Sequence, residues 1–357
     1  METRKIQQVG GGTFTVSLPQ DWAQAEGIGQ GDVVDLHTHI DGTLVVETRD
    51  REPEPTGGIT IELRDTDSEQ IRAALWAAYT AGYTEIILTA KDTLPRSQRR
   101  VANEVANVLA GATVTTTTEQ ELVIDVLLDP DEISVRQLVR QLSYVAISMH
   151  KTAMAAVADP RSELDLADRD DQADRLFAMT ERSFTRALAR LSEVDSLGVT
   201  RPELFELWSV ARDLERVADH AERIGTIACE FDSPPDGTHV AALESLAERA
   251  RAVVDYAVSS IVDNEGVEIV CEALRLRSHV REEVVELDRR LFRDDTADYR
   301  LARLLDSIQR TAEHGGNIAE RGLQRESRHR NGDSNPMNLL AECDCDAGAV
   351  NVLELSG

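Results

Sequence analysis

Lysine is nearly absent from this chain of 357 residues, which carries 65 acidic residues and a formal net charge of −27. Of its 38 basic residues, three are lysines (Lys5, Lys91 and Lys151) and the rest are arginines. Such a surface suits a cytoplasm at molar salt, where the Debye length falls to about 3 Å and self-repulsion is screened. We therefore interpret the charge as the adaptation of a halophilic organism. The charge therefore neither excludes a nucleic-acid partner nor indicates a basic one.

Cysteines and long apolar segments are also scarce. Four cysteines in a chain of this length do not make a disulfide framework. No stretch approaches the ~20 consecutive apolar residues of a membrane span, and the first residues are polar, without the apolar core of a signal peptide. We expect a cytoplasmic protein with no stable membrane insertion. Its 41% of hydrophobic residues indicates folded domains, and its length indicates two or more of them.

Residues 1–50 have the pattern of a small β module. Polar and apolar residues alternate over 13–18, and an Asp41-Gly42 turn joins two short strands, which is a strong hairpin signal. A short helix is expected between these strand pairs. Fifty residues with so few apolar positions bury too little surface to be stable alone, so we expect dimerisation. Proline, glycine and charge then predict a linker over 51–58.

Residues 59–129 predict a small α/β sandwich with the element order β-α-β-α-β-β. Ser68 is the expected N-cap of its first helix, and Pro95 opens the second.

From residue 131 onward the apolar spacing predicts helices alone. The six expected helices cover 134–158, 167–193, 202–229, 241–260, 265–292 and 298–324. They divide into two three-helix units, 131–230 and 240–325, followed by a flexible tail over 326–357.

An internal repeat supports this division. Residues 212–224 align with residues 306–318 at a fixed offset of 94. The alignment pairs three positions of interest, Arg216 with Arg310, Asp219 with Glu313 and His220 with His314.

Paired acids in the first copy predict a cation site. Glu215 and Asp219 lie four residues apart and therefore project from one helical face. Asp171 and Asp174 on the preceding helix meet them if the two helices pack antiparallel. Converging carboxylates suit hard ions such as Mg, Ca, Mn or ferric iron. The alternative is that these acids form ion pairs on a solvated face with three arginines, Arg175, Arg212 and Arg216.

These helices resemble those of PhoU proteins. The segment Arg212-Asp-Leu-Glu-Arg-Val-Ala-Asp-His-Ala221 is similar to the signature helix of that family, and residues 170–177 are similar to its other acidic helix. The resemblance covers about 131–325. It implies two three-helix bundles, multinuclear metal sites and a role in phosphate homeostasis, through contact with a phosphate-transporter ATPase or a sensor kinase. The implied ligands are Asp171, Asp174, Glu215 and Asp219 in the first repeat and Glu283, Glu286 and Glu313 in the second, where Gln309 departs from the motif.

The N-terminal segment resembles the SpoVT/AbrB DNA-binding domain, a swapped-hairpin dimer. The resemblance rests on Val9-Gly-Gly-Gly-Thr-Phe-Thr-Val-Ser-Leu-Pro19 and on Gly27-Ile-Gly-Gln-Gly-Asp-Val-Val34. Three basic residues face eight acidic ones over 1–50, so a dimerisation module that contacts no DNA stays open as the alternative. The candidate DNA-binding residues are Arg4, Lys5, Gln7, Gln8 and Thr13.

The expected fold is thus a multidomain α+β protein: a swapped-hairpin β module, a small β-α-β-α-β-β sandwich and an all-α pair of three-helix bundles. The expected function is that of a homodimeric, non-enzymatic, phosphate-responsive regulator that binds metal and DNA; the metal and the direct effector stay open. One alternative is a carboxylate-bridged di-metal enzyme, but His220 and His314 directly follow an acid and so point about 100° away from it, unlike a Glu-x-x-His motif. The other alternative is a purely structural dimer scaffold.

Overall fold

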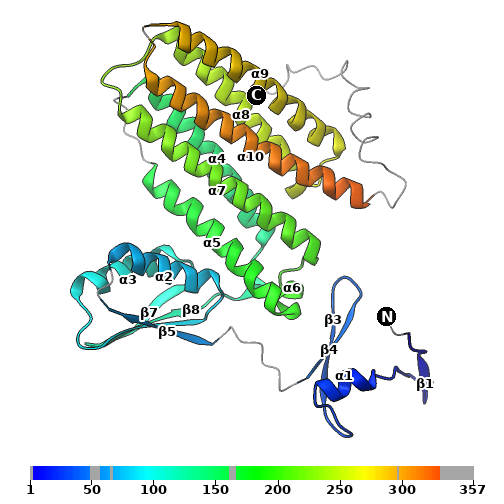
Figure 1. Ribbon diagram of the computed structural model, residues 1–357. Helices are drawn as coiled ribbons and strands as arrows, with labels where there is room; N and C mark the ends of the chain where they lie inside the picture. The colour runs from blue at the N-terminus through cyan, green and yellow to red at the C-terminus, as the bar shows by residue number, and fades with distance from the viewer. Residues whose placement is uncertain (1–2, 49–56, 65–66, 161–165, 296, 330–357) are drawn as a thin grey trace.

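The computed structural model describes residues 3–48, 57–64, 67–160, 166–295 and 297–329 (Figure 1). A small β module, an α/β module and a long helical region follow one another along the chain, so the protein has the expected multidomain α+β fold. Most of the predicted linker at 51–58 and of the predicted tail at 326–357 lies outside the described residues.

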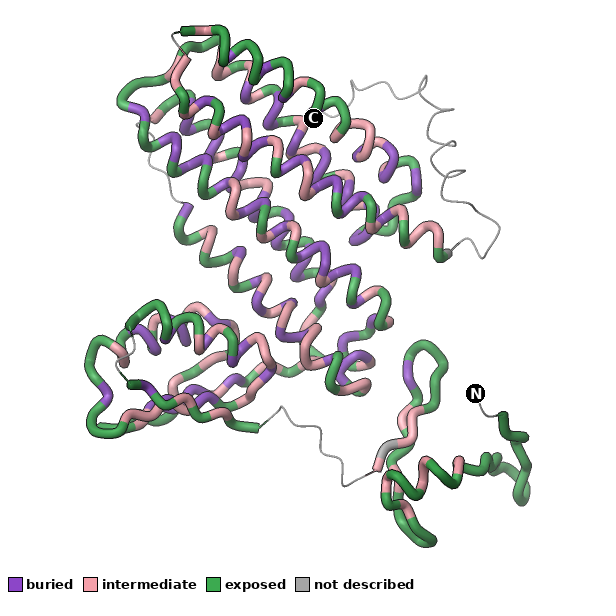
Figure 2. The backbone as a smooth tube through the Cα atoms, viewed as in Figure 1, coloured by how far each residue is buried: buried purple, intermediate pink, exposed green. Residues whose placement is uncertain are grey.

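The N-terminal module contains two separate antiparallel hairpins. Strand β1 (Gln7–Val9) pairs with β2 (Thr13–Thr15), and β3 (Val34–Thr38) pairs with β4 (Leu44–Thr48). Helix α1 (Gln20–Ala25) lies between the hairpins and ends before Gly27, whose φ of +70° favours glycine. No apolar side chain among the module's described residues is buried, and Phe14 is 69% exposed. Figure 2 shows this module almost entirely as exposed chain.

The α/β module has a four-stranded sheet in the order β5-β6-β8-β7. Strand β5 (Gly58–Leu63) runs parallel to β6 (Glu85–Ala90), whereas β8 (Glu121–Val126) is antiparallel to β6 and to β7 (Ala112–Thr117). Helices α2 (Ser68–Thr80) and α3 (Arg96–Val108) cover one face of the sheet in Figure 1. The element order is the predicted one.

The N-cap of α2 is Asp67 and not the predicted Ser68. The Asp67 carboxylate accepts a hydrogen bond from the Gln70 backbone N–H at 2.8 Å, and the Gln70 side chain accepts one from the Asp67 N–H at 3.3 Å. This reciprocal pair is a capping box, which satisfies two backbone donors at once. Ser68 offers no such pair and becomes the first helical residue.

Within its described residues, the helical region contains six long α-helices and a short one. They are α4 (Val135–Ala158), α5 (Ala167–Ala189), α6 (Leu191–Ser196), α7 (Arg201–Cys229), α8 (Gly237–Val262), α9 (Val267–Arg293) and α10 (Tyr299–His329). Helices α4, α7, α8 and α10 pack together where the two repeats meet, and one hydrophobic core runs through both repeats. None of the described helices is long and apolar enough to cross a membrane.

Three helix ends differ from the prediction by four residues or more, and one of them is the start of α8 at Gly237 instead of residue 241. The helix expected over 167–193 breaks at Arg190, which has extended backbone angles (φ −137°, ψ 120°). The last helix runs to His329 instead of ending at residue 324. Its final turn is held because the Arg325 and Arg328 guanidinium groups pair with Glu206 of α7, whose side chain is buried.

Candidate functional site

Acidic side chains of α5 and α7 lie close enough to repel one another. Burial raises the pKa of Asp174 to about 6, and the negative charges of Asp219 and Asp171 raise it further. The pKa of Glu215 rises to about 7 because of burial and the charge of Asp219, against the opposing effect of Arg216. The two helices therefore bring the four predicted first-repeat ligands, Asp171, Asp174, Glu215 and Asp219, into one electrostatic cluster, which we call the acidic cluster.

Two further acids, Asp170 and Glu222, belong to the acidic cluster and were not predicted as ligands. Burial and the charges of Asp174 and Glu222 raise the pKa of Asp170 to about 7. The signal for both lay in the sequence spacing. Asp170 precedes Asp174 by four residues, and Glu222 follows Asp219 by three, so each shares a helical face with a predicted ligand.

Arginines neutralise only part of the acidic cluster. The Arg216 Nη1 donates to Asp219 Oδ2 at 2.9 Å, and its Nε lies 3.4 Å from Glu215 Oε2. The other two arginines of the ion-pair alternative are engaged elsewhere. Arg175 donates to the Val108 carbonyl at 2.6 Å, and the Arg212 guanidinium lies over the Trp208 ring. The carboxylates thus outnumber the cations around them, and this excess of negative charge adds to burial in raising their pKa values.

The donor chemistry of the acidic cluster suits a cation, but chelating geometry is not formed. All its donors are carboxylate oxygens, which hard divalent and trivalent ions prefer. Among the residues that the structure describes, no three Asp, Glu, His or Cys side chains converge in an arrangement that holds a metal ion. Asp171 is exposed, and the Asp219 side chain is 42% exposed.

The predicted ligands of the second repeat face arginines instead. Glu283 of α9 pairs with Arg249 of α8. Glu313 of α10 accepts two hydrogen bonds from Arg281 of α9, both at 2.5 Å, and these bonds lower the pKa of Glu313. Glu286 is exposed. The structure therefore places a separate guanidinium group beside each of two of the three acids, whereas in the first repeat Arg216 alone contacts both Glu215 and Asp219.

The two histidines of the internal repeat meet between the repeats. The rings of His220 and His314 lie 5.6 Å apart between centroids, and His314 Nδ1 is 2.9 Å from an Asp213 carboxylate oxygen. Burial lowers the pKa of His220 to about 4, and the charges of His314 and Arg310 lower it further. Residues at equivalent positions of the repeat thus form a junction between α7 and α10.

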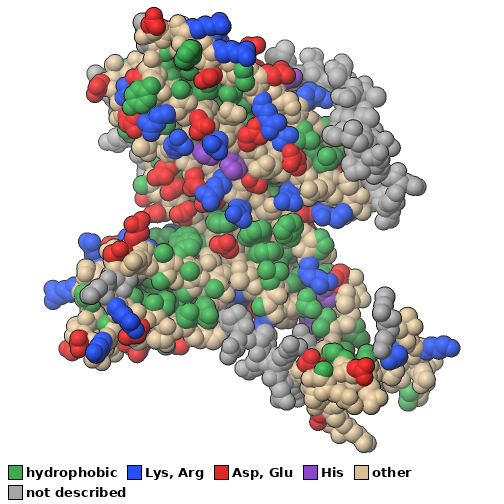
Figure 3. Space-filling model, viewed as in Figure 1, with side chains coloured by type: hydrophobic (Ala, Val, Ile, Leu, Met, Phe, Trp, Pro, Cys, Tyr) green, Lys and Arg blue, Asp and Glu red, His purple; other side chains and the backbone are tan. Residues whose placement is uncertain are grey.

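Basic and acidic side chains are intermixed over the visible face of the helical region in Figure 3.

The five candidate DNA-binding residues, Arg4, Lys5, Gln7, Gln8 and Thr13, are all exposed and lie on or beside the β1–β2 hairpin. They do not share one face. Gln7 and Gln8 are consecutive strand residues and project to opposite sides. The register pairs Gln7 with Thr15 and Val9 with Thr13, so Gln7 and Thr13 share a face that Gln8 does not.

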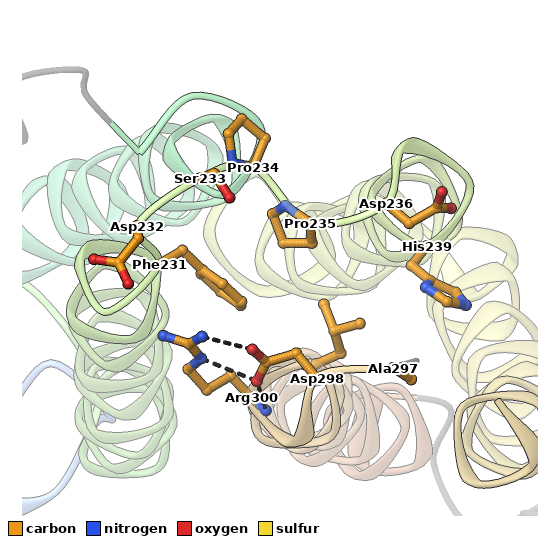
Figure 4. A pocket seen from close by; sticks show the side chains of 11 residues that line it. Phe231, Asp232, Ser233, Pro234, Pro235, Asp236, His239, Ala297, Asp298 and Arg300 are labelled. Carbon is orange, nitrogen blue, oxygen red and sulfur yellow. Dashed lines mark hydrogen bonds and ion pairs between the residues drawn. The ribbon is translucent and has the colours of Figure 1, made fainter. Parts of the chain in front are cut away.

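A pocket of about 220 Å³ lies apart from all of these residues (Figure 4). The loop between α7 and α8 and the start of α10 line it. Arg300 donates to the Asp298 carboxylate from Nε at 2.9 Å, and its guanidinium lies 4.2 Å from the centroid of the Phe231 ring. Every residue predicted as a ligand or DNA contact lies outside the lining.

The fold and the acidic cluster define a class of protein, a helical repeat protein preceded by a small β module. A family model for the PhoU domain matches residues 139–228, and a model described as antidote-toxin recognition MazE, bacterial antitoxin, matches residues 7–54. None of the curated proteins matches the chain significantly. The two family-model matches confirm the resemblance to the PhoU domain over residues 139–228 and to a MazE/AbrB-like domain over residues 7–54.

Proposed function

We propose that this chain is a phosphate-responsive, non-enzymatic regulator, in which the helical region binds a cation and the N-terminal module binds DNA as a homodimer. One observation carries the proposal. The residues that match the PhoU domain contain all four predicted first-repeat ligands, and these lie together in a cluster short of positive charge. The cytoplasm is the proposed location.

The cation is a hard ion such as iron, Mg, Mn or Ca, held by Asp171, Asp174, Glu215 and Asp219. Burial first, and then the charges of neighbouring carboxylates, raise the pKa values of Asp174 and Glu215. These shifts support this part of the proposal, because a bound cation favours the ionised carboxylates and relieves their repulsion. The second repeat takes up metal less readily, since arginines already pair with Glu283 and Glu313.

Metal analysis of the purified protein tests the cation site. We expect Asp219→Ala to lower bound metal, measured by inductively coupled plasma mass spectrometry after dialysis against Mn²⁺. The matched control is Glu313→Ala at the equivalent position of the repeat, which should leave the metal content unchanged. Equal metal content in the Asp219→Ala variant and the unaltered protein would refute the assignment.

The exposed apolar side chains of the N-terminal module support dimerisation. Phe14, Leu36 and Leu44 lie on strands that bury none of them within one chain, and a second copy of the module is the partner that the MazE/AbrB-like match suggests. DNA contact is proposed through Arg4, Lys5, Gln7, Gln8 and Thr13. At molar salt this contact relies on hydrogen bonds more than on counterion release.

A gel shift at high potassium tests the DNA contact. The probe is the DNA upstream of phosphate-transport genes, and the control is the same chain without residues 1–48. We expect a shift with the full chain alone. No shift at any salt concentration would leave a dimerisation module, and a phosphate-transporter ATPase or a sensor kinase would then be the proposed target.

The structure gives no support to a di-metal enzyme of the Glu-x-x-His type. The His220 ring lies against His314, and the His314 ring bonds to Asp213. Both imidazoles are thus engaged at the repeat junction and not with the acidic cluster.

A further inference from the structure

The tip of the β3–β4 hairpin contacts the helical region at α6 (Figure 1). Asp195 of α6 accepts hydrogen bonds from the rings of His37 and His39, the latter from Nδ1 at 2.5 Å. The backbone N–H of Ile40 also donates to Asp195, at 2.9 Å. One carboxylate thus receives three donors from residues more than 150 positions earlier in the chain.

A second ion pair lies beside the first contact. Arg201, the first residue of α7, donates to the Asp41 carboxylate in the hairpin turn at 3.0 Å. His39 is only 2% exposed, although the module around it is open to solvent. Its Nε2 lies 3.6 Å from Asp41 Oδ2. The buried His39 ring therefore lies between a carboxylate of the helical region, Asp195, and one of the hairpin turn itself, Asp41.

The charges favour this arrangement. Burial opposes ionisation of Asp195, but the Ile40 N–H and the two imidazoles outweigh it and lower the pKa of Asp195. Hydrogen bonds to an ionised carboxylate are about twice as strong as neutral ones. The docked carboxylate therefore stays charged and holds its three donors at neutral pH.

The docking position also connects to the acidic cluster. Helix α6 follows α5 directly, and Arg186 of α5 pairs with Glu193 of α6 across the break at Arg190. The helix that carries Asp170, Asp171 and Asp174 thus continues into the segment that receives the hairpin. A displacement of α5 would move the docking position with it.

We propose that Asp195 and Arg201 form a docking site for the β3–β4 hairpin of the same chain, through which the helical region sets the position of the N-terminal module. The partner of this surface is residues 37–41. The inference rests on neither the cation nor the DNA of the proposed function. If the module binds DNA, docking fixes the direction in which the β1–β2 hairpin is presented.

Two substitutions remove the docking contacts without harming the helices. Asp195→Asn removes a carboxylate from the last turn of α6, and Arg201→Glu removes a cation from the first turn of α7. Both original charges oppose the helix dipole, so their removal does not weaken either helix. The control is Asp232→Asn, a charge removal at an exposed residue distant from the hairpin.

Hydrogen–deuterium exchange of the full chain in concentrated KCl measures docking. We expect peptides covering residues 34–48 to exchange about tenfold faster in Asp195→Asn and in Arg201→Glu, with Asp232→Asn unchanged and helical circular dichroism equal in all proteins. Protection that persists on hundredfold dilution supports docking within one chain. Unchanged exchange in both variants, or protection that is lost on dilution, would overturn the proposal.

Discussion

At the scale of single residues, the two repeats place their carboxylates in different surroundings. The pKa of Glu215 rises because burial and Asp219 disfavour its charge, whereas the pKa of Glu313 falls because Arg281 binds both of its oxygens. The internal repeat keeps an acid at one matching pair, Asp219 and Glu313, but Gln309 stands where the first repeat has Glu215. In the second repeat a guanidinium already neutralises the Glu313 carboxylate.

Neutralising the acidic cluster should stabilise the metal-free protein. The pKa values of Asp170 and Glu215 are raised to about 7 from ordinary values of 3.8 and 4.5. The folded state therefore binds more protons than the unfolded state between about pH 4 and pH 7, and the stability from these groups falls as pH rises through that range. In urea unfolding with EDTA at pH 8, the double variant Asp170→Asn/Glu215→Gln should have a free energy of unfolding about 1–2 kcal/mol higher than that of the parent, after allowance for solvent screening.

The gain should vanish below pH 4, where the carboxyl groups are protonated in both states. Glu286→Gln, at an exposed residue, is the control and should change nothing. A double variant that is no more stable than the parent at pH 8 would show that the acids do not repel one another.

Because His150 of α4 is buried, we expect the protein to lose stability in acid. Burial lowers the pKa of His150 to about 3, and the charge of Arg251 contributes. Between pH 6.5 and about 3 the unfolded state binds the proton and the folded state does not, so stability falls as pH falls. Between pH 7 and pH 4, the free energy of unfolding of the parent should fall by about 2–4 kcal/mol more than that of the His150→Leu variant. Urea unfolding across this range measures the loss, and parallel curves for the two proteins would contradict it.

At the scale of elements, α5 joins the α/β module to the helical region. Arg182 donates to the Tyr79 carbonyl at 2.6 Å, and Arg175 donates to the Val108 carbonyl at the end of α3. The carbonyls at helix C-termini have no partner within the helix and carry partial negative charge, so cations there are favourable. The sequence places these arginines on a helix but does not show that they cap two others.

Arg182→Met should therefore destabilise the α/β module. Arg182 is 3% exposed, and its guanidinium lies 5.0 Å from the centroid of the Tyr79 ring. Burial lowers its pKa to about 10, so the side chain is charged at neutral pH. Loss of this charged hydrogen bond should cost about 2–3 kcal/mol in urea unfolding. Arg72→Ala, which breaks only the exposed pair with Glu104, should cost less than about 1 kcal/mol.

The sequence predicts the elements well and their tertiary contacts poorly. Apolar spacing and cap residues locate each long helix to within a few residues, and helical spacing places Glu215 and Asp219 on one face. The break at Arg190 has no glycine or proline to signal it. The extension of α10 to His329 depends on Glu206, which lies in another helix. Likewise, the pairing of Glu283 with Arg249 follows from how α8 and α9 pack.

At the scale of the whole molecule, the N-terminal module is the part whose described residues bury no apolar side chain. Its strands expose Phe14, Leu36 and Leu44, whereas the main core of the helical region is continuous through both repeats. We expect light scattering after gel filtration to give twice the chain mass of 39.4 kDa. Phe14→Asp should shift the mass toward that of one chain, because it puts a charge into the apolar contact. A variant that stays dimeric would place the dimer contact elsewhere.

The central claim is that the acidic cluster of α5 and α7 binds a cation, and anomalous diffraction from crystals soaked in Mn²⁺ tests it most directly. The account predicts an anomalous peak among Asp174, Glu215 and Asp219, and none beside Glu313, where Arg281 already holds the carboxylate. Crystals with no peak at the acidic cluster, or with a peak only at Glu313, would contradict it.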